Sequence, residues 1–295
     1  MQHARRRIEQ ALDGAIQRAE TRGAPPRLAA AMRHAVWPGG ARIRPHLCLA
    51  VSLACGDRHP LLADGAAAAL ELMHCASLVH DDLPCFDDAS TRRGQPAVHV
   101  VYGERLAVLA GDALIVLAFE TLSLAATTSQ GAPMSSLPAM LGVLARRTGM
   151  PFGIVAGQAW ECEDFVALPD YQRAKTGALF AGATELGALA AGSNPDTWRA
   201  FGEALGEAYQ VADDIRDAAC DAAMLGKPVG RDRTLGRPSA VAEMGLAGAL
   251  KHFEALVDSA RNAVPDGPGS QALRGLLHAE AERLLPASVR AQAVA

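Results

Sequence analysis

Apolar residues recur at helical spacing along most of the chain, and no run alternates between apolar and polar positions over the length of a strand. Turn-forming residues separate several of the periodic segments, for example at 131–133 and 192–195. The pattern predicts an all-α fold, a single domain spanning residues 1–295 with roughly ten helices. The helices are expected at 2–20, in a short segment ending near 36, and at 43–55, 60–82, 104–127, 136–148, 149–165, 170–191 and 195–218.

Two polar segments, 87–99 and 218–239, interrupt this apolar pattern, and each directly follows a cluster of aspartates. The second segment is rich in glycine and basic residues, among them Lys227 and Arg237. Such a composition suits a lid that closes over phosphate, and it also suits an ordinary surface loop.

The two aspartate clusters lie at the ends of long apolar segments, where unpaired carboxylates are costly to bury. Carboxylate oxygens are the ligands that Mg²⁺ prefers, and like charges gathered in one site call for a cation. A single acidic cluster is usually a solvated surface, whereas two matched clusters followed by basic residues indicate a cage for metal-bound diphosphate. The candidate metal ligands are Asp81, Asp82 and Asp87 in the first cluster and Asp213, Asp214 and Asp217 in the second.

The spacing within each cluster suggests which carboxylates cooperate. Asp213 and Asp217 are four residues apart, so on a helix they share a face and can reach one ion. Asp81 and Asp87 are six residues apart, which separates them by about 120° on an ideal helix. Pro84 should disturb the helix between them and could bring Asp87 back towards Asp81.

Composition and charge narrow the class of protein. Half of the residues are hydrophobic but only 4% are aromatic, so the core is expected to be mostly Ala, Leu and Val. The net charge of −4 gives no case for nucleic-acid binding. Six scattered cysteines without a C-x-x-C pair predict reduced thiols in a cytoplasm.

No membrane or secretory segment is expected. The N-terminal helix is basic but no apolar run follows it, so it is not a signal peptide. The most apolar stretch, 106–126, is interrupted by Gly111, Asp112 and Glu120, which favours a core helix over a membrane span. The chain is therefore predicted not to be an integral membrane protein.

Six motifs together resemble the trans-isoprenyl diphosphate synthases, the polyprenyl synthetase family, and they follow in order from about residue 30 to 240. The run ELMHCASLVHDDLP at 71–84, continued by RRGQP at 92–96, is similar to the first aspartate-rich region of the family. YQVADDIRD at 209–217 and LGKP at 225–228 resemble the second. GGARIRP at 39–45 looks like the family's G-G-K-R-x-R-P, and KTG at 175–177 and GQ at 157–158 match two further motifs.

The resemblance implies an all-α homodimer whose subunits each hold both aspartate motifs around a central cavity. It implies head-to-tail condensation of isopentenyl diphosphate with an allylic diphosphate of five to fifteen carbons. The allylic diphosphate is bound through three Mg²⁺ ions and ionises to an allylic cation, which the double bond of isopentenyl diphosphate then attacks. An apolar cavity protects such a cation from water.

The resemblance also assigns roles residue by residue. Asp81, Asp87 and Asp213 become the leading Mg²⁺ ligands, and Asp82 and Asp217 the next. For Asp214 it is the helix geometry, about a quarter turn from Asp213, that leaves two roles open, a ligand of a second ion or an outer partner. Arg92, Lys175 and Lys227 are expected to bind the allylic diphosphate; Arg42, His74 and Arg93 the isopentenyl diphosphate; and Arg237 a substrate diphosphate from the lid. Thr176 and Gln210, beside Lys175, are expected at the reaction centre. His74 is equally consistent with a satisfied histidine on a helix face.

Three positions depart from the family pattern. Ala41 stands where a lysine is expected, and its loss should weaken isopentenyl diphosphate binding by about 1–3 kcal/mol unless Arg42 or Arg44 compensates. Glu161 replaces the aspartate of G-Q-x-x-D, and Arg237 replaces a lysine. None of these changes removes a leading metal ligand, so activity is still expected.

Small residues one helical turn before the first cluster bear on product length. Ala76 and Ser77 precede Asp81 by five and four residues, and in farnesyl-type bacterial members the first of these positions tends to be a bulky aromatic. Ala76 leaves the tunnel open, so we predict a twenty-carbon product, geranylgeranyl diphosphate, with Met73, Leu72 and Phe119 as candidates for a deeper floor. The alternatives are a fifteen-carbon product, farnesyl diphosphate, and a tight helix contact at Ala76 with no role in length.

Two other classes remain as alternatives. A class I terpene cyclase also uses D-D-x-x-D, but its second motif is usually of N-S-E type and its pocket is rich in aromatic residues. A non-catalytic partner subunit typically loses an aspartate cluster, and here both clusters are present.

Overall fold

The fold is almost entirely helical, as predicted. The computed structural model of the chain describes residues 2–37, 39–129, 131, 136–164, 167–219, 239–286 and 289–290. The helices are α1 (Gln2–Ala19), α2 (Pro26–Val36), α3 (Ile43–Ala54), α4 (Pro60–Asp81), α5 (Val98–Tyr102), α6 (Glu104–Thr128), α7 (Ser136–Thr148), α8 (Ile154–Ala159), α9 (Leu168–Gln172), α10 (Ala178–Ala190), α11 (Asp196–Ala219), α14 (Ala240–Ala263) and α15 (Ser270–Leu284). A 3₁₀ turn (Trp160–Cys162), a π-helical turn (Arg173–Gly177) and a hairpin of β1 (Thr91–Arg92) and β2 (Gln95–Pro96) complete the described elements.

The chain forms two compact units, and the prediction of a single domain stays a prediction. Unit 1 comprises residues 1–144 and 186–193, and unit 2 comprises residues 145–185 and 194–295. The first aspartate cluster therefore belongs to unit 1 and the second to unit 2. The central cavity implied by the resemblance also stays a prediction.

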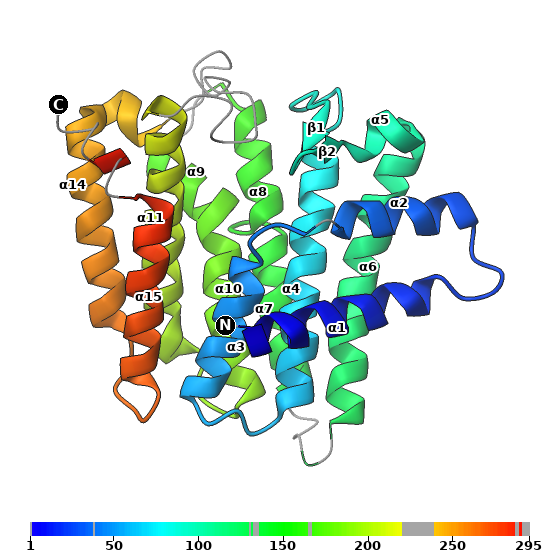
Figure 1. Cartoon of the computed structure of the whole chain (residues 1–295), viewed down its shortest axis with the longest axis horizontal. Helices are drawn as coiled ribbons and strands as arrows, with labels where there is room; N and C mark the ends of the chain where they lie inside the picture. The colour runs from blue at the N-terminus through cyan, green and yellow to red at the C-terminus, as the bar shows by residue number, and fades with distance from the viewer. Residues whose placement is uncertain are drawn as a thin grey trace. The chain divides into compact units, whose positions relative to one another are not determined.

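In unit 1, α4 packs against α6 and α3, while α1 and α2 lie across the long helices (Figure 1). Alanines and leucines make α4 almost wholly buried between its neighbours, as expected from a core poor in aromatic residues. Gly65 allows α4 to approach α6 closely, because a Cβ added there would overlap the side chain of Ala125. Near the other end of α4, where the first aspartate cluster begins, Gly111 of α6 leaves room for the ring of His80.

In unit 2, α11, α14 and α15 lie side by side around an apolar core that includes Ile215 and Phe253 (Figure 1). The hydroxyl of Ser239 accepts a hydrogen bond from the backbone N–H of Ala242 and so caps the start of α14. On another side, α11 contacts the π-helical turn that carries Lys175.

Three local features differ from the predicted pattern. The helix expected from residue 149 starts only at Ile154, after turns that contain Pro151, which has no backbone N–H to donate. The helix expected over 170–191 contains the π-helical turn. The polar segment 87–99 holds the β1–β2 hairpin, whose two-residue strands are too short to show alternation.

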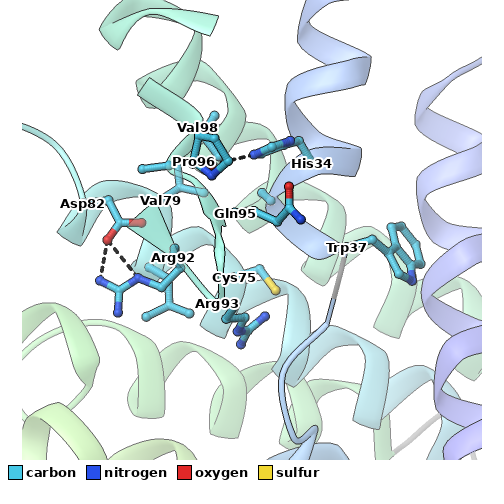
Figure 2. Close-up of a pocket in the computed structure, with 13 residues that line it drawn as sticks. His34, Trp37, Cys75, Val79, Asp82, Arg92, Arg93, Gln95, Pro96 and Val98 are labelled. Atoms are coloured by element: carbon cyan, nitrogen blue, oxygen red, sulfur yellow. Dashed lines mark hydrogen bonds and ion pairs between the residues drawn. The ribbon is translucent and has the colours of Figure 1, made fainter. Parts of the chain in front are cut away.

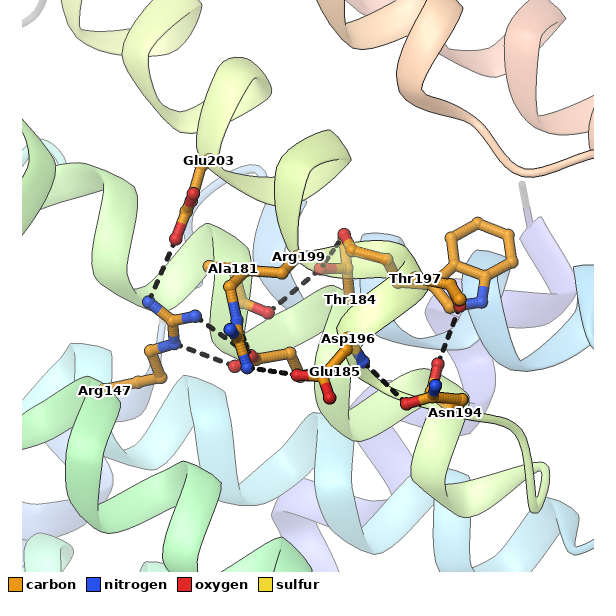
Figure 3. Close-up of polar contacts among 10 residues, drawn as sticks. Arg147, Ala181, Thr184, Glu185, Asn194, Asp196, Thr197, Arg199 and Glu203 are labelled. Carbon is orange, nitrogen blue, oxygen red and sulfur yellow. Dashed lines mark hydrogen bonds and ion pairs between the residues drawn. The ribbon is translucent and has the colours of Figure 1, made fainter.

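A buried ion-pair network connects three residues of unit 2, which are Arg147, Glu185 and Arg199 (Figure 3). Glu185 of α10 is 1% exposed, and its two oxygens accept hydrogen bonds from Arg147 Nε and Nη2 at 2.8 and 2.9 Å. Arg199 Nε donates to the same carboxylate at 2.8 Å. Burial alone would raise the pKa of Glu185, but the two arginines outweigh it and hold that pKa below its usual value.

Replacing Glu185 by Gln is expected to lower the free energy of unfolding by about 3 kcal/mol at pH 7, because two arginines lose their buried counter-charge. The lowered pKa of Glu185 means that its contribution is present above the ordinary value of 4.5 and is lost as the pH falls through the folded value. Urea unfolding of both proteins, followed from pH 7 towards acid, measures the difference. A difference that stays constant across this range would contradict the assignment.

Two described helices are long and apolar enough to cross a membrane by length and composition alone, α4 and α6. In the most apolar window of α4, 78% of the residues are buried inside the protein, whereas the corresponding share for α6 is 44%. The apolar surface of α4 is thus covered by its own chain, and that of α6 is covered only in part.

Candidate active site

The first aspartate cluster folds back on itself immediately after α4. The backbone N–H of Asp87 donates to the carbonyl of Asp81 at 2.9 Å, and that of Asp88 donates to the carbonyl of Leu83 at 3.0 Å. The turn brings one carboxylate oxygen of Asp81 and one of Asp87 within 4.8 Å of each other. The convergence expected from Pro84 is therefore present, and it places both side chains where one ion can bridge them.

Asp82 has a different environment from Asp81. Its side chain is 3% exposed and forms an ion pair with Arg92, whose Nε lies 2.9 Å from Asp82 Oδ1 (Figure 2). Arg92 Nη2 also lies 3.8 Å from Asp81 Oδ2. Burial raises the pKa of Asp82, and Arg92 only partly offsets this effect. Asp82 thus orients Arg92 beside the candidate metal ligands.

The β1–β2 hairpin presents the two adjacent arginines. Arg93 and Gly94 form its turn with φ angles of +54° and +76°, which is the conformation that two-residue hairpins prefer. Arg92, Arg93 and Asp82 all line one pocket of unit 1, shown in Figure 2. The turn geometry therefore places two cations at the edge of the first aspartate cluster.

His74 lies on α4, with its Nε2 3.3 Å from Arg44 Nη1. Among the described residues, its Nδ1 has no hydrogen-bond partner. Burial, reinforced by the charges of Arg44 and Arg93, holds the pKa of His74 well below its usual range, so the imidazole is neutral at pH 7. A neutral ring beside arginines can accept one hydrogen bond and donate another, which is compatible with the predicted substrate contact.

Arg42 is buried, in contrast to the open position that direct substrate binding requires. Its side chain is 1% exposed, and it pairs with Glu71 at 2.7 Å and Glu9 at 3.0 Å. Its role in binding isopentenyl diphosphate stays a prediction. The sequence reasoning did not single out Glu71 as a partner, although a carboxylate inside the apolar run 60–79 was the available signal.

The second cluster separates into exposed and buried carboxylates on α11. Asp213 has a side chain 32% exposed and forms an ion pair with Arg216 at 2.6 Å. Asp217 is half-buried and follows Asp213 by one helical turn, so both lie on one face as predicted. These two side chains have the exposure that metal ligands require.

Asp214 is 6% exposed and is held by donors from its own unit. Its oxygens accept hydrogen bonds from Gln210 Nε2 at 2.9 Å, Gln172 Nε2 at 3.3 Å and the backbone N–H of Ala240 at 2.8 Å. Thr176 Oγ1 donates to Gln210 Oε1 at 2.6 Å. The structure thus brings together three predicted site residues, Thr176, Gln210 and Asp214, in one hydrogen-bonded chain, with Asp214 in an anchoring position.

Lys175 lies on the π-helical turn and forms an ion pair with Glu161. Tyr171 donates its hydroxyl hydrogen to Glu161 Oε1 at 2.5 Å, and Gln158 Nε2 donates to Glu161 Oε2 at 3.1 Å. Gly157 permits this approach, because a Cβ there would overlap the backbone of Lys175. π-Helical turns often occur at functional sites, and this one aims a lysine at the carboxylate that replaces the family's aspartate.

Each cluster by itself has ligands that suit Mg²⁺. In unit 1, Asp81 and Asp87 offer converging carboxylate oxygens. In unit 2, Asp213 and Asp217 offer carboxylates one helical turn apart, and such hard oxygen ligands are those that Mg²⁺ prefers.

Other predicted site residues have no tested role. Lys227 and Arg237 lie outside the described residues. Ala76 and Met73 are both 1% exposed on α4, and the hydroxyl of Ser77 donates to the carbonyl of His74 at 2.8 Å. Their part in product length stays a prediction.

Comparison with known proteins agrees with the motifs. Residues 25–264 match the family model described as polyprenyl synthetase. The chain is 53% identical to a geranylgeranyl diphosphate synthase of Cereibacter sphaeroides, over 97% of this chain and 98% of the relative. It is 46% identical to a geranylgeranyl diphosphate synthase of Rhodobacter capsulatus, over 96% and 97%.

A solved structure shares the fold. A geranyltransferase of Helicobacter pylori, crystallised in complex with magnesium and isoprenyl diphosphate, superposes with a TM-score of 0.80 at 27% identity. The match covers 96% of this chain and 97% of that one.

Proposed function

We propose that this chain, which belongs to the polyprenyl synthetase family, condenses isopentenyl diphosphate with allylic diphosphates to give geranylgeranyl diphosphate. The observation that carries the proposal is the fold-back of Asp87 onto Asp81 beside Arg92, which gathers two carboxylates and a cation at the end of an apolar helix. The twenty-carbon product is supported by the small residue at Ala76 and by the names of the two bacterial relatives.

The chain's own residues supply binding and orientation. Asp81, Asp87 and Asp213 would hold Mg²⁺, three ions in all with the bound diphosphate, with Asp82, Asp217 and Asp214 supporting them. The bound ions supply positive charge that stabilises the departing diphosphate. Arg92 is oriented towards that group by Asp82, and Lys175 and Lys227 bind it as well.

Isopentenyl diphosphate and the developing allylic cation contact different residues. Arg93 and neutral His74 bind the diphosphate of isopentenyl diphosphate, with Arg44 beside His74 in place of the lysine missing at Ala41. Thr176 donates its hydrogen to Gln210, so the lone pairs of its oxygen can face the developing allylic cation.

Incorporation of labelled isopentenyl diphosphate into longer, acid-labile diphosphates tests the reaction class. The proposal predicts incorporation with an allylic diphosphate of five, ten or fifteen carbons, and loss of incorporation when Mg²⁺ is chelated. Cyclic hydrocarbons formed from the allylic diphosphate alone would instead support the terpene cyclase.

We further propose a soluble, cytoplasmic homodimer. Several apolar side chains of α6 are exposed, with Val116 at 68%, Leu109 at 50% and Val108 at 42%, and α5 adds Val100 and Val101 beside them. A second copy of the chain is the occupant that the family resemblance implies for this surface.

Replacing Val116 by Glu is expected to convert the dimer to a monomer, because a charge would be buried in the apolar contact. Sedimentation velocity of the wild-type and variant proteins at equal concentration measures the change. Leu53→Glu is the matched control, since Leu53 on α3 is 66% exposed and lies outside the α5–α6 surface. A V116E protein that remains dimeric would count against this surface as the interface.

A further inference from the structure

Arg42 forms hydrogen bonds to residues of unit 1 through each of its three guanidinium nitrogens. Its Nε donates to Glu9 Oε1 at 3.0 Å, its Nη1 to Glu71 Oε1 at 2.7 Å and its Nη2 to the carbonyl of Val36 at 2.8 Å. All three guanidinium nitrogens therefore have partners while the side chain is 1% exposed. Burial alone would lower the pKa of Arg42, but Glu71 and Glu9 raise it, so the buried charge is retained.

Glu71 joins this arginine to a second one. Its side chain is 2% exposed, and the same Oε1 that accepts from Arg42 lies 3.7 Å from Arg93 Nη2. Arg93 is 21% exposed and lines the pocket beside the first aspartate cluster (Figure 2). One buried carboxylate oxygen thus lies between a wholly internal cation and a pocket-facing cation.

The two glycines at 39 and 40 make room for both guanidinium groups. A Cβ added at Gly39 would overlap the guanidinium of Arg42, and one added at Gly40 would lie 2.8 Å from Arg93 Nε. At the other end, Glu9 accepts a hydrogen bond from Trp37 Nε1 at 2.9 Å through its second oxygen. The contacts form a continuous chain from α1 through the glycine turn to α4 and the hairpin.

We propose that Glu9, Arg42 and Glu71 form a buried network of ion pairs, the Arg42 network, that positions Arg93 to bind the diphosphate of isopentenyl diphosphate. Glu71 and Arg42 are positioning residues in this assignment, and Arg93 is the group that touches the substrate. The inference rests on the proposed function. It differs from the direct contact predicted for Arg42, because a diphosphate cannot reach a guanidinium enclosed on all sides.

Steady-state kinetics of the Glu71→Gln variant test the assignment. Gln keeps the shape of the side chain but removes the charge that holds Arg93, so the KM for isopentenyl diphosphate should rise roughly tenfold. The kcat and the KM for the allylic diphosphate should change by less than about twofold, because the first aspartate cluster and Arg92 are untouched. In an Arg93→Gln background, E71Q should have no further effect on the KM.

Glu185→Gln is the matched control, since Glu185 is equally buried between two arginines but lies in unit 2. It should lower the melting temperature without a selective rise in the KM for isopentenyl diphosphate. An E71Q protein that behaves like E185Q, or that raises this KM by the same factor with and without Arg93, overturns the assignment.

A variant on α1 keeps the test decisive if E71Q does not fold. Glu9 has a side chain 30% exposed, so Glu9→Gln is expected to fold, and it should raise the same KM by a smaller factor. An unchanged KM for isopentenyl diphosphate in E9Q would contradict the role proposed for the Arg42 network. Absence of elongation by the wild-type protein would refute the proposed function itself. Normal elongation by the wild-type protein, together with an unchanged KM for isopentenyl diphosphate in the variants, would refute only the role of the Arg42 network.

Discussion

Replacing Asp81 by Asn should reduce the rate of elongation at saturating substrate by about a thousandfold, equivalent to about 4 kcal/mol of transition-state stabilisation. The reason is local geometry, because a carboxylate oxygen of Asp81 and one of Asp87 lie within 4.8 Å of each other. The hydrogen bond from the backbone N–H of Asp87 to the carbonyl of Asp81 holds the two residues in this position. Asn keeps the shape and the turn but removes one of the two converging charges. Elongation is measured with labelled isopentenyl diphosphate over a range of Mg²⁺ concentrations.

The control for this prediction is Asp266→Asn. The Asp266 side chain is 96% exposed and pairs with Arg274 near the C-terminal helix, so its loss should leave elongation unchanged. The variant D81N should keep the wild-type melting temperature, because the backbone hydrogen bonds of the turn do not use its side chain. A D81N protein with more than about a tenth of wild-type activity would exclude Asp81 as a principal metal ligand.

Replacing Ala76 by Phe should shorten the product from twenty carbons to fifteen. Position 76 lies on α4, five residues before Asp81, and its present side chain is a methyl group. A phenyl ring there would occupy the space that the resemblance assigns to the growing tail. The product ratio is read by mass after incubation with isopentenyl diphosphate and geranyl diphosphate.

Two further variants separate length control from damage to the core. Ala76 is 1% exposed, so Phe is expected to cost about 1–3 kcal/mol of stability by overpacking, which urea unfolding will show. Ala76→Ser keeps the small volume and should keep the twenty-carbon product, while Ser77→Phe should shorten it as A76F does. A folded A76F protein that still makes mainly the twenty-carbon product would favour the simple helix-contact explanation of Ala76.

The periodicity of the sequence was sufficient to predict the helical fold and much of the first cluster. The apolar spacing placed α4 and α6 to within two residues of their observed ends, because long buried helices leave a strong periodic signal. The return of Asp87 to Asp81 was expected from Pro84, and the structure shows it directly after α4 ends at Asp81.

The parts that could not be predicted depend on contacts distant in sequence. The motif G-G-A-R-I-R-P does not reveal that Arg42 is internal and that Arg44 contacts His74. That difference arises from the left-handed backbone at Arg42, with φ +51°, and from Glu71 on another helix. Likewise, the adjacent Asp213 and Asp214 look alike in sequence, yet only Asp214 meets the backbone of Ala240.

Helix periodicity also failed where the backbone departs from α geometry. The π-helical turn at Arg173–Gly177 changes the direction of Lys175 and Thr176 without changing the apolar pattern that a helix requires. The exposed apolar face of α6 had the same composition as core, so the sequence could not separate a partner surface from buried packing.

The chain-elongation activity and its product length are tested together by the mass of the product made from isopentenyl diphosphate and each allylic diphosphate of five, ten and fifteen carbons in the presence of Mg²⁺. We expect all three reactions to end mainly in a twenty-carbon linear diphosphate. Arrest at fifteen carbons would contradict the product assignment, and no elongation by the folded protein would contradict the assignment as a prenyl diphosphate synthase.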